Sequence, residues 1–360
     1  MIAQKAINIF EKVRVFQRKI YLSAKADNKR KFGILYDKVC RKDILRVAWY
    51  YVKNNKGSAG IDDLTIKEIE DKGVQNFLDE IQVQLKSKKY QPKAVKRVYI
   101  PKANGKKRPL GIPTVKDRVV QTAVKIVIEP IFEADFQDFS YGFRPRRSAN
   151  QAIREIYKYL NFGCEWVIDA DLKGYFDTIP HDKLLLLVKE RVTDKSVIKL
   201  LSLWLEAGIM EDNQVRSNIL GTPQGGVISP LLANIYLNAL DRYWTNNRLA
   251  ERGQDAHLIR YADDFVILCS NNPKKYYNYA KRRISKLGLT LNEDKTRIVH
   301  ASEGFDFLGY TLRKGKSLKT GKYKTYYYPS RKSMKAIKGK IKDITQHGQH
   351  LKLSEVVEKL

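Results

Sequence analysis

Two apolar segments that carry acidic residues constrain the fold of this chain more than any other feature. One is I-R-Y-A-D-D-F-V-I-L (Ile259–Leu268), and the other is W-V-I-D-A-D (Trp166–Asp171). Each pattern is typical of a strand buried in a sheet, where a carboxylate is costly unless its charge is neutralised, for instance by a metal ion. The sequence therefore predicts a sheet that gathers acidic side chains from distant parts of the chain.

The positions of the acids indicate which of them can converge. Asp263 and Asp264 fall at a tight turn, where neighbouring side chains project to opposite sides, so only some carboxylates can face one point. We expect Asp171, at the end of the other strand, to supply a further one. An Asp-Asp pair alone is most often a solvated turn, and it is the second acidic strand that favours a Mg²⁺ site. Two such ions about 3.5–4 Å apart support polymerase chemistry at a 3′-hydroxyl and a leaving pyrophosphate.

Positive charge is concentrated at both ends of the chain. The 360 residues hold 68 Lys and Arg against 39 Asp and Glu, a formal net charge of +29. Residues 1–60 and 311–360 each carry +11, which leaves +7 for the 250 residues between them. Basic ends around a nearly balanced middle favour a nucleic-acid partner over an evenly solvated surface. The charge does not distinguish DNA from RNA.

Helical and strand patterns alternate along the chain and predict an α+β fold. Helices are predicted over 66–85, over 115–132 and from Ser229-Pro230 onward, where a cap residue precedes a first-turn proline. Residues 94–101 alternate and lead into Asn104-Gly105, which predicts a hairpin with a basic tip. A single strand is predicted over 305–312.

Other features limit the class of protein. No run approaches 18 consecutive apolar residues, and the first 20 residues show no secretory signal, so we expect a cytoplasmic protein with no membrane partner. Cys40, Cys164 and Cys269 are widely spaced with no C-x-x-C pair, and neither a disulfide framework nor a cysteine zinc site is expected. The five histidines show no ligand spacing with one another, and we assign them no catalytic role.

Four sequence words follow one another in a characteristic order. They are G-I-P-T-V-K-D-R-V-V-Q (Gly111–Gln121), Y-G-F-R-P-x-R-S (Tyr141–Ser148), Q-G-G-x-x-S-P (Gln224–Pro230) and Y-A-D-D (Tyr261–Asp264). Together they resemble reverse transcriptases, and their surroundings resemble the bacterial group II intron-encoded branch known as maturases. Y-x-D-D alone is a weak signal, whereas several blocks in family order are specific. The resemblance, from about residue 57 to 328, implies a right-hand polymerase fold with fingers and palm, an antiparallel palm sheet flanked by helices, and a partial helical thumb.

The resemblance also implies a catalytic set. Asp171 and Asp263 are expected to be the principal ligands of two Mg²⁺ ions, with Mn²⁺ as a substitute, and Asp264 to be the third acidic member. Lys295, within L-N-E-D-K-T, matches the position of a candidate general acid for pyrophosphate. Asp169, two residues before the first of these aspartates, is assigned a structural role.

Nucleotide contacts are carried over from the family in the same way. Phe176 is expected under the sugar of the incoming deoxynucleotide, where a bulky ring rejects a 2′-hydroxyl, although a plain core aromatic is the alternative. Lys102 and Arg108 on the hairpin are expected to contact the triphosphate, with a solvated tip as the alternative. Gln224 is expected to pack against the nucleotide.

Template and primer contacts are expected at two further places. Gly225 and Gly226 have no side chains and allow close approach of backbone to nucleic acid. Arg144 is expected to grip template phosphates, with a buried structural cation as the alternative. The block F-D-F-L-G-Y matches the segment that holds the primer strand in the family; its candidate residues are Phe307, Leu308 and Gly309.

The predicted function is that of a group II intron reverse transcriptase. It would copy an RNA template, intron RNA by expectation, from a DNA primer or target with deoxynucleotides, within a bacterial ribonucleoprotein that also supports splicing and mobility. The alternatives are an RNA-binding maturase with little polymerase activity, or a domesticated reverse transcriptase linked to CRISPR or defence. The expected division is a basic helical extension (1–56), fingers (57–165), catalytic palm (166–312), and a basic linker with a thumb or maturase segment that looks truncated (313–360).

Overall fold

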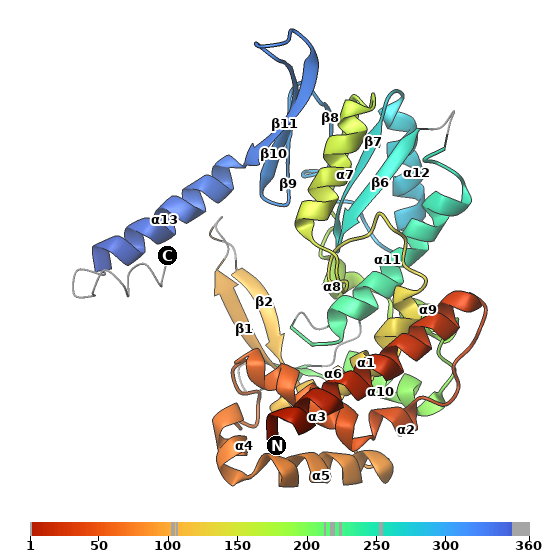
Figure 1. Ribbon diagram of the computed structural model, residues 1–360, viewed down its shortest axis with the longest axis vertical. Helices are drawn as coiled ribbons and strands as arrows, with labels where there is room; N and C mark the ends of the chain where they lie inside the picture. The colour runs from red at the N-terminus through yellow and green to blue at the C-terminus, as the bar shows by residue number, and fades with distance from the viewer. Residues whose placement is uncertain are drawn as a thin grey trace. The chain divides into compact units, whose positions relative to one another are not determined.

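The computed structural model describes residues 2–101, 105, 107–211, 214–216, 220–222, 225–251 and 255–347 (Figure 1). They form two compact units, each built from separate stretches of chain. The first comprises Met1–Asp138, Leu172–Tyr243 and Arg282–Thr290, and the second comprises Phe139–Asp171, Trp244–Lys281 and Leu291–Leu360. The four-part division expected from the sequence stays a prediction. Across the described ranges, no helix is both long and apolar enough to span a bilayer.

Helices dominate the first unit, and α6 (Val115–Glu133) is its centre. Nearly every residue of α6 is buried, a distribution typical of a helix enclosed on all sides. Three helices from the N-terminal region pack against it: α1 (Ile2–Ala26), α2 (Tyr36–Val39) and α3 (Lys42–Asn54). The remaining helices of this unit are α4 (Ile66–Lys72), α5 (Val74–Lys86), α8 (Tyr175–Thr178), α9 (His181–Lys189) and α10 (Lys195–Glu206), with most of α11 (Ser229–Asn246).

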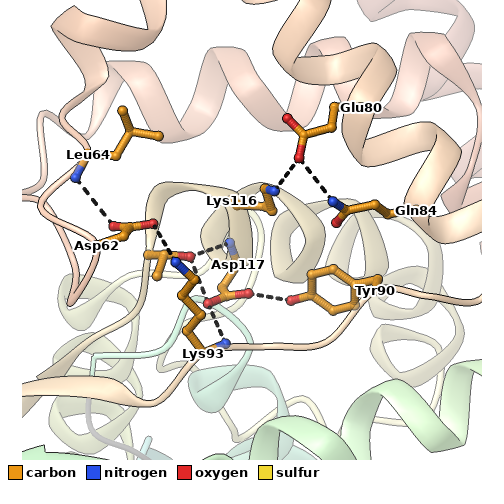
Figure 2. A network of polar contacts seen from close by, with 9 residues as sticks. Asp62, Leu64, Glu80, Gln84, Tyr90, Lys93, Lys116 and Asp117 are labelled. Carbon is orange, nitrogen blue, oxygen red and sulfur yellow. Dashed lines mark hydrogen bonds and ion pairs between the residues drawn. The ribbon is translucent and has the colours of Figure 1, made fainter.

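A buried carboxylate fixes the beginning of α6. Asp117 accepts hydrogen bonds from the hydroxyls of Tyr90 (2.6 Å) and Thr114 (2.7 Å) and from the backbone N–H of Lys93 (3.2 Å). Figure 2 shows the contacts with Tyr90 and Lys93. Burial raises the pKa of Asp117, and these donors oppose that shift. Thr114 in turn caps the helix by accepting the N–H of Asp117. These hydrogen bonds connect the sequence word Gly111–Gln121, which contains Asp117, to the segment with Tyr90 and Lys93 that precedes β1.

The prediction of one helix over 66–85 is wrong, because two helices, α4 and α5, occupy that range. Gly73 ends α4 and precedes α5 with φ of +101°, a conformation that other residues rarely adopt. A capping box at Thr65 and Glu68 begins α4. The predicted helices at 115–132 and from Ser229 are confirmed by α6 and α11.

The sheet of the first unit has the order β2-β1-β4-β5. The antiparallel pair of β1 (Val95–Pro101) and β2 (Lys107–Ile112) confirms the predicted hairpin. Lys102 and Asn104, at its tip, lie outside the described residues. The other strands are β4 (Ile209–Glu211), parallel to β1, and β5 (Gln214–Arg216).

The second unit contains the acidic strands in one antiparallel sheet of order β6-β7-β3-β8. Its members are β3 (Trp166–Ala170), β6 (Ala256–Tyr261), β7 (Asp264–Cys269) and β8 (Arg297–His300). Helix α7 (Ala149–Asn161) lies beside β6 in Figure 1, and its apolar face joins Val167, Ile259 and Val266 in one core. Helix α12 (Pro273–Lys286) follows β7 in the chain. The predicted α+β fold with an antiparallel sheet is confirmed.

A second sheet, of order β11-β10-β9, replaces the single strand predicted over 305–312. Strands β9 (Phe305–Phe307) and β10 (Tyr310–Lys316) are separated by Leu308 and Gly309, which both have positive φ, the geometry of a two-residue hairpin turn. Apolar alternation hid this turn because Leu308 is an unusual residue at such a position. Strand β11 (Tyr323–Pro329) and helix α13 (Arg331–His347) complete the unit.

Candidate active site

The turn between β6 and β7 carries the paired aspartates. Tyr261 pairs with Asp264 across the ladder, so Ala262 and Asp263 form a two-residue turn. Ala262 has φ of +59°, a conformation that costs a non-glycine residue about 1–3 kcal/mol and persists only where the surroundings impose it. The side chain of Arg260 is fully buried and donates a hydrogen bond to the Ala262 carbonyl at 2.8 Å. This buried cation therefore supports the turn from within its own strand.

The word Y-G-F-R-P packs directly against this turn. Backbone hydrogen bonds join Arg260 N–H to the carbonyl of Phe139 and Tyr141 N–H to the carbonyl of Arg260, each at 2.9 Å. A Cβ on Gly142 would lie 2.3 Å from the backbone nitrogen of Ala262. Only glycine allows this approach, so the residue helps to set the position of Asp263.

The sheet register brings Asp171 toward the same end of β7. Ala170 pairs with Phe265 at the end of the β3–β7 ladder, and continuing this register by one residue would set Asp171 opposite Asp264. Residues directly opposite in an antiparallel pair have Cβ atoms about 4.5–5.5 Å apart. The predicted convergence of two acidic segments is thus supported by the strand pairing.

Two side chains from the loop before β8 hold the Asp171 carboxylate. The Lys295 ammonium lies 3.0 Å from Oδ2, and the Asn292 amide donates to the same oxygen at 2.9 Å. The backbone N–H of Asn292 also donates to the Asp171 carbonyl at 2.8 Å. The sequence predicted Lys295 but missed Asn292 and Arg260. Asn292 lies in the same word as Lys295, L-N-E-D-K-T, and this word was the sequence signal by which it could have been found.

Negative charge accumulates around these carboxylates. Burial, followed by the charge of Asp264, raises the pKa of Asp169 to about 6, with smaller contributions from Asp171 and Asp306 and an opposing one from Arg297. A site with this excess of carboxylate oxygens suits a hard divalent cation such as Mg²⁺. Within the described ranges, Asp171, Asp263 and Asp264 do not form a group with all ligand atoms within 4.8 Å of one another. Their role as metal ligands stays a prediction.

In the first unit, Phe176 lies beside an open pocket. Phe176 is 8% exposed, and its backbone carbonyl accepts the Thr222 N–H at 2.6 Å. The pocket has a volume of about 280 Å³ and is lined by Thr222, Gly221 and Asp177 together with hairpin residues such as Arg97 and Tyr99. This arrangement is compatible with a nucleotide beside Phe176, which stays a prediction.

Of the other nucleotide candidates, the structure describes Arg108. Arg108 is exposed on β2 opposite Ile100. Lys102 and Gln224 lie outside the described residues. Gly225 has φ of +111°, and a Cβ there would lie 2.4 Å from the Gly111 carbonyl oxygen, so glycine is required for this contact with β2. Gly226 is buried beside it in the chain.

Gly225 and Gly226, which are template and primer candidates, lie in the first unit, and the remaining candidates of this kind belong to the second. Arg144 is buried and donates to the Ser140 carbonyl at 2.6 Å, which favours the structural alternative. Phe307 is buried in the core, whereas Leu308 and Gly309 form the turn between β9 and β10. The Gly309 carbonyl accepts the Ser330 N–H and the Ser333 hydroxyl, each at 2.8 Å. This turn is therefore fixed to the beginning of α13.

Comparisons with known proteins identify the family to which this chain belongs. The profile of the family "Reverse transcriptase (RNA-dependent DNA polymerase)" matches residues 100–312. "Protein YkfC" of Escherichia coli (strain K12) is 40% identical over 268 residues, covering 65% of this chain and 70% of that protein. "Group II intron-encoded protein LtrA" of Lactococcus lactis is 33% identical over 346 residues, and the match spans 78% of this chain but 57% of LtrA. Among solved structures, apo telomerase from Candida tropicalis is 18% identical with a TM-score of 0.49, covering 62% of this chain and 47% of that one.

Proposed function

Because the chain belongs to the reverse transcriptase family and is related to group II intron-encoded proteins, we propose that it copies RNA into DNA. The proposed reaction extends a DNA primer or nicked target on an RNA template with deoxynucleotides. Intron RNA is the proposed template, because the relative LtrA is an intron-encoded protein. A cytoplasmic ribonucleoprotein is the proposed setting.

The observation that carries this proposal is the position of Asp171. It follows the Ala170–Phe265 pair that ends the β3–β7 ladder, and Lys295 and Asn292 hold its carboxylate at 3.0 and 2.9 Å. We propose that Asp171, Asp263 and Asp264 hold two Mg²⁺ ions, for which Mn²⁺ would substitute. Bound there, such ions supply the positive charge that activates a 3′-hydroxyl and stabilises a leaving pyrophosphate.

Residues of the chain are assigned the remaining tasks. Lys295 would donate a proton to the departing pyrophosphate, since its ammonium already lies at the carboxylate. Phe176 would select the sugar of the incoming nucleotide, and Arg108, with Lys102 and Gln224, would bind and orient the triphosphate. The turn at Leu308 and Gly309 would position the primer strand.

The test is primer extension on an RNA template with the full chain and Mg²⁺. Asp263→Ala should abolish extension while RNA affinity and the thermal midpoint stay close to wild type, because the residue lies at a half-exposed turn. Glu251→Ala is the matched control, since it removes an exposed acid of the same unit whose ion pair with Arg248 is also exposed. Wild-type extension by Asp263→Ala would refute the site.

A second function, intron RNA binding that assists splicing, is favoured by the charge at both ends of the chain. Neutralising six to ten phosphates would make affinity fall by roughly 10³–10⁵ between 50 and 200 mM salt. If this function is independent of polymerisation, Asp263→Ala should still bind intron RNA and promote splicing. A maturase with little polymerase activity would instead bind RNA without extending a primer. A domesticated reverse transcriptase would bind RNA without promoting splicing.

A further inference from the structure

A second group of ligand side chains lies in the unit that contains β6, apart from the carboxylates at its turn. Cys164 follows α7, Asp255 immediately precedes β6, and His257 is the second residue of that strand. One ligand atom from each lies within 4.8 Å of the other two. Among the residues that the structure describes, this is the group of three His, Cys, Asp or Glu side chains close enough to share a metal ion. We propose that Cys164, Asp255 and His257 bind a Zn²⁺ ion.

The chemistry of the three ligands selects the ion. Thiolate, imidazole and carboxylate are the ligands of Zn²⁺, whereas Mg²⁺ prefers oxygen ligands alone. Ligand atoms about 2.0–2.3 Å from a tetrahedral zinc ion lie roughly 3.3–3.6 Å from one another. Ligand atoms near the 4.8 Å limit would therefore have to move about 1 Å closer, and a water molecule would complete the coordination.

The cluster is held in place by its surroundings. The His257 imidazole stacks on Tyr159 with ring centroids 3.9 Å apart and 15° between the planes, and its Nε2 lies 2.9 Å from Asp255 Oδ1. Cys164 is 3% exposed, and its N–H donates to the Tyr159 carbonyl at 3.1 Å. One residue of α7 thus contacts two of the proposed ligands, which keeps them close before an ion binds.

The backbone on the β6 side is fixed as well. Asp255 has φ of +53°, which aspartate tolerates better than most residues, and its N–H donates to the Glu251 carbonyl at 3.0 Å. The next residue, Ala256, donates to the Leu249 carbonyl at 2.8 Å and accepts from the Trp244 indole N–H at 2.7 Å. These hydrogen bonds fix the backbone at Asp255, so its side chain is oriented before a metal ion binds.

This site is distinct from the proposed catalytic one. Strand β6 begins beside Asp255 and ends at the turn that carries Asp263. At about 3.3 Å per residue, its length separates the two places by roughly 15–20 Å. A zinc ion here would join the loop after α7 to β6 and stabilise the strand that carries the catalytic turn. Sequence spacing gave no indication of it, because Cys164 and His257 come from distant stretches of the chain.

The test measures metal content rather than activity. The full chain, stripped with a chelator and dialysed against Zn²⁺, should retain one equivalent by mass spectrometry, and its thermal midpoint should rise by several degrees. Co²⁺ in place of Zn²⁺ should give a thiolate-to-cobalt charge-transfer band. Cys164→Ser and His257→Gln should each weaken Zn²⁺ binding by more than about tenfold, and Cys164→Ser should remove the band.

Two controls separate this site from the rest of the protein. Cys40→Ser removes a buried thiol of the other unit and should leave zinc content and the cobalt band unchanged. Asp263→Ala should also retain the zinc ion, so loss of extension and loss of zinc are distinguishable. Should Cys164→Ser fail to fold, His257→Gln provides the same test at a half-buried position. A wild-type chain that retains no zinc, or both ligand variants binding like wild type, would overturn the proposal.

Discussion

Replacement of Lys295 by alanine separates a chemical role from a structural one. The Lys295–Asp171 pair has an ammonium-to-oxygen distance of 3.0 Å, but the lysine side chain is 65% exposed and the aspartate 30%. Ion pairs this open to solvent contribute about 0–1 kcal/mol to the free energy of unfolding. Asn292 still holds the Asp171 carboxylate at 2.9 Å in the variant, so the position of that carboxylate should change little.

The expected effect on catalysis is much larger than the effect on stability. General acid catalysis contributes about 10²–10⁴-fold, which corresponds to roughly 3–5 kcal/mol of activation free energy. Lys295→Ala should therefore slow single-turnover nucleotide addition by at least about 100-fold, while the free energy of unfolding falls by less than about 1 kcal/mol.

A matched control lies in the same unit. The Lys281 ammonium is 2.6 Å from Glu293, in a pair that is 48% and 65% exposed. Lys281→Ala should change stability by a similarly small amount and leave the rate of addition at the wild-type value. The measurement is rapid-quench primer extension beside thermal melting. Equal rates for the two variants, or a Lys295→Ala rate within threefold of wild type, would refute the proposed proton donor.

Three further predictions concern other parts of the chain. Phe176→Ala should allow ribonucleotide incorporation, and unchanged sugar selectivity in competition assays would contradict the proposed gate. Gly142→Ala should lower the thermal midpoint and impair extension, because the new Cβ would lie 2.3 Å from the Ala262 nitrogen; crystallography of the variant would reveal a displaced turn. Burial opposes the ionisation of Asp194, but four backbone N–H donors at 2.8–3.2 Å lower its pKa. The stabilisation from the ionised carboxylate is therefore present above the unfolded-state pKa and is lost as pH falls through the folded-state pKa. Asp194→Ala should therefore cost about 3 kcal/mol at neutral pH and reduce the acid dependence of unfolding, as followed by circular dichroism.

Periodicity predicted the elements whose stability comes from one apolar pattern. Helix α6 and the β6–β7 hairpin were predictable because their buried residues recur at helical and strand spacing. The break at Gly73 and the turn at Leu308 were missed, since both depend on backbone conformations within continuous apolar patterns.

The candidate site was predictable where one word contains the chemistry. Asp171, Asp263 and Lys295 became candidates through their sequence words, and their catalytic roles stay predictions. Asn292 acts through a tertiary contact with Asp171, and Arg260 acts through a hydrogen bond to the Ala262 carbonyl; residue type alone specifies neither contact. The group of Cys164, Asp255 and His257 was not predicted, because the packing of α7 against β6, and not sequence spacing, brings its members together.

The interleaving of the two compact units affects how this protein can be dissected. Each unit takes three separate stretches of the chain, and two of the boundaries fall inside α11 and α12. A single cut in the gene therefore cannot release one unit intact, because any fragment lacks strands or helices that its core requires. Point substitutions are therefore the way to separate the role of the sheet β6-β7-β3-β8 from that of the unit containing the β1–β2 hairpin, since deletions across this region would produce misfolded protein.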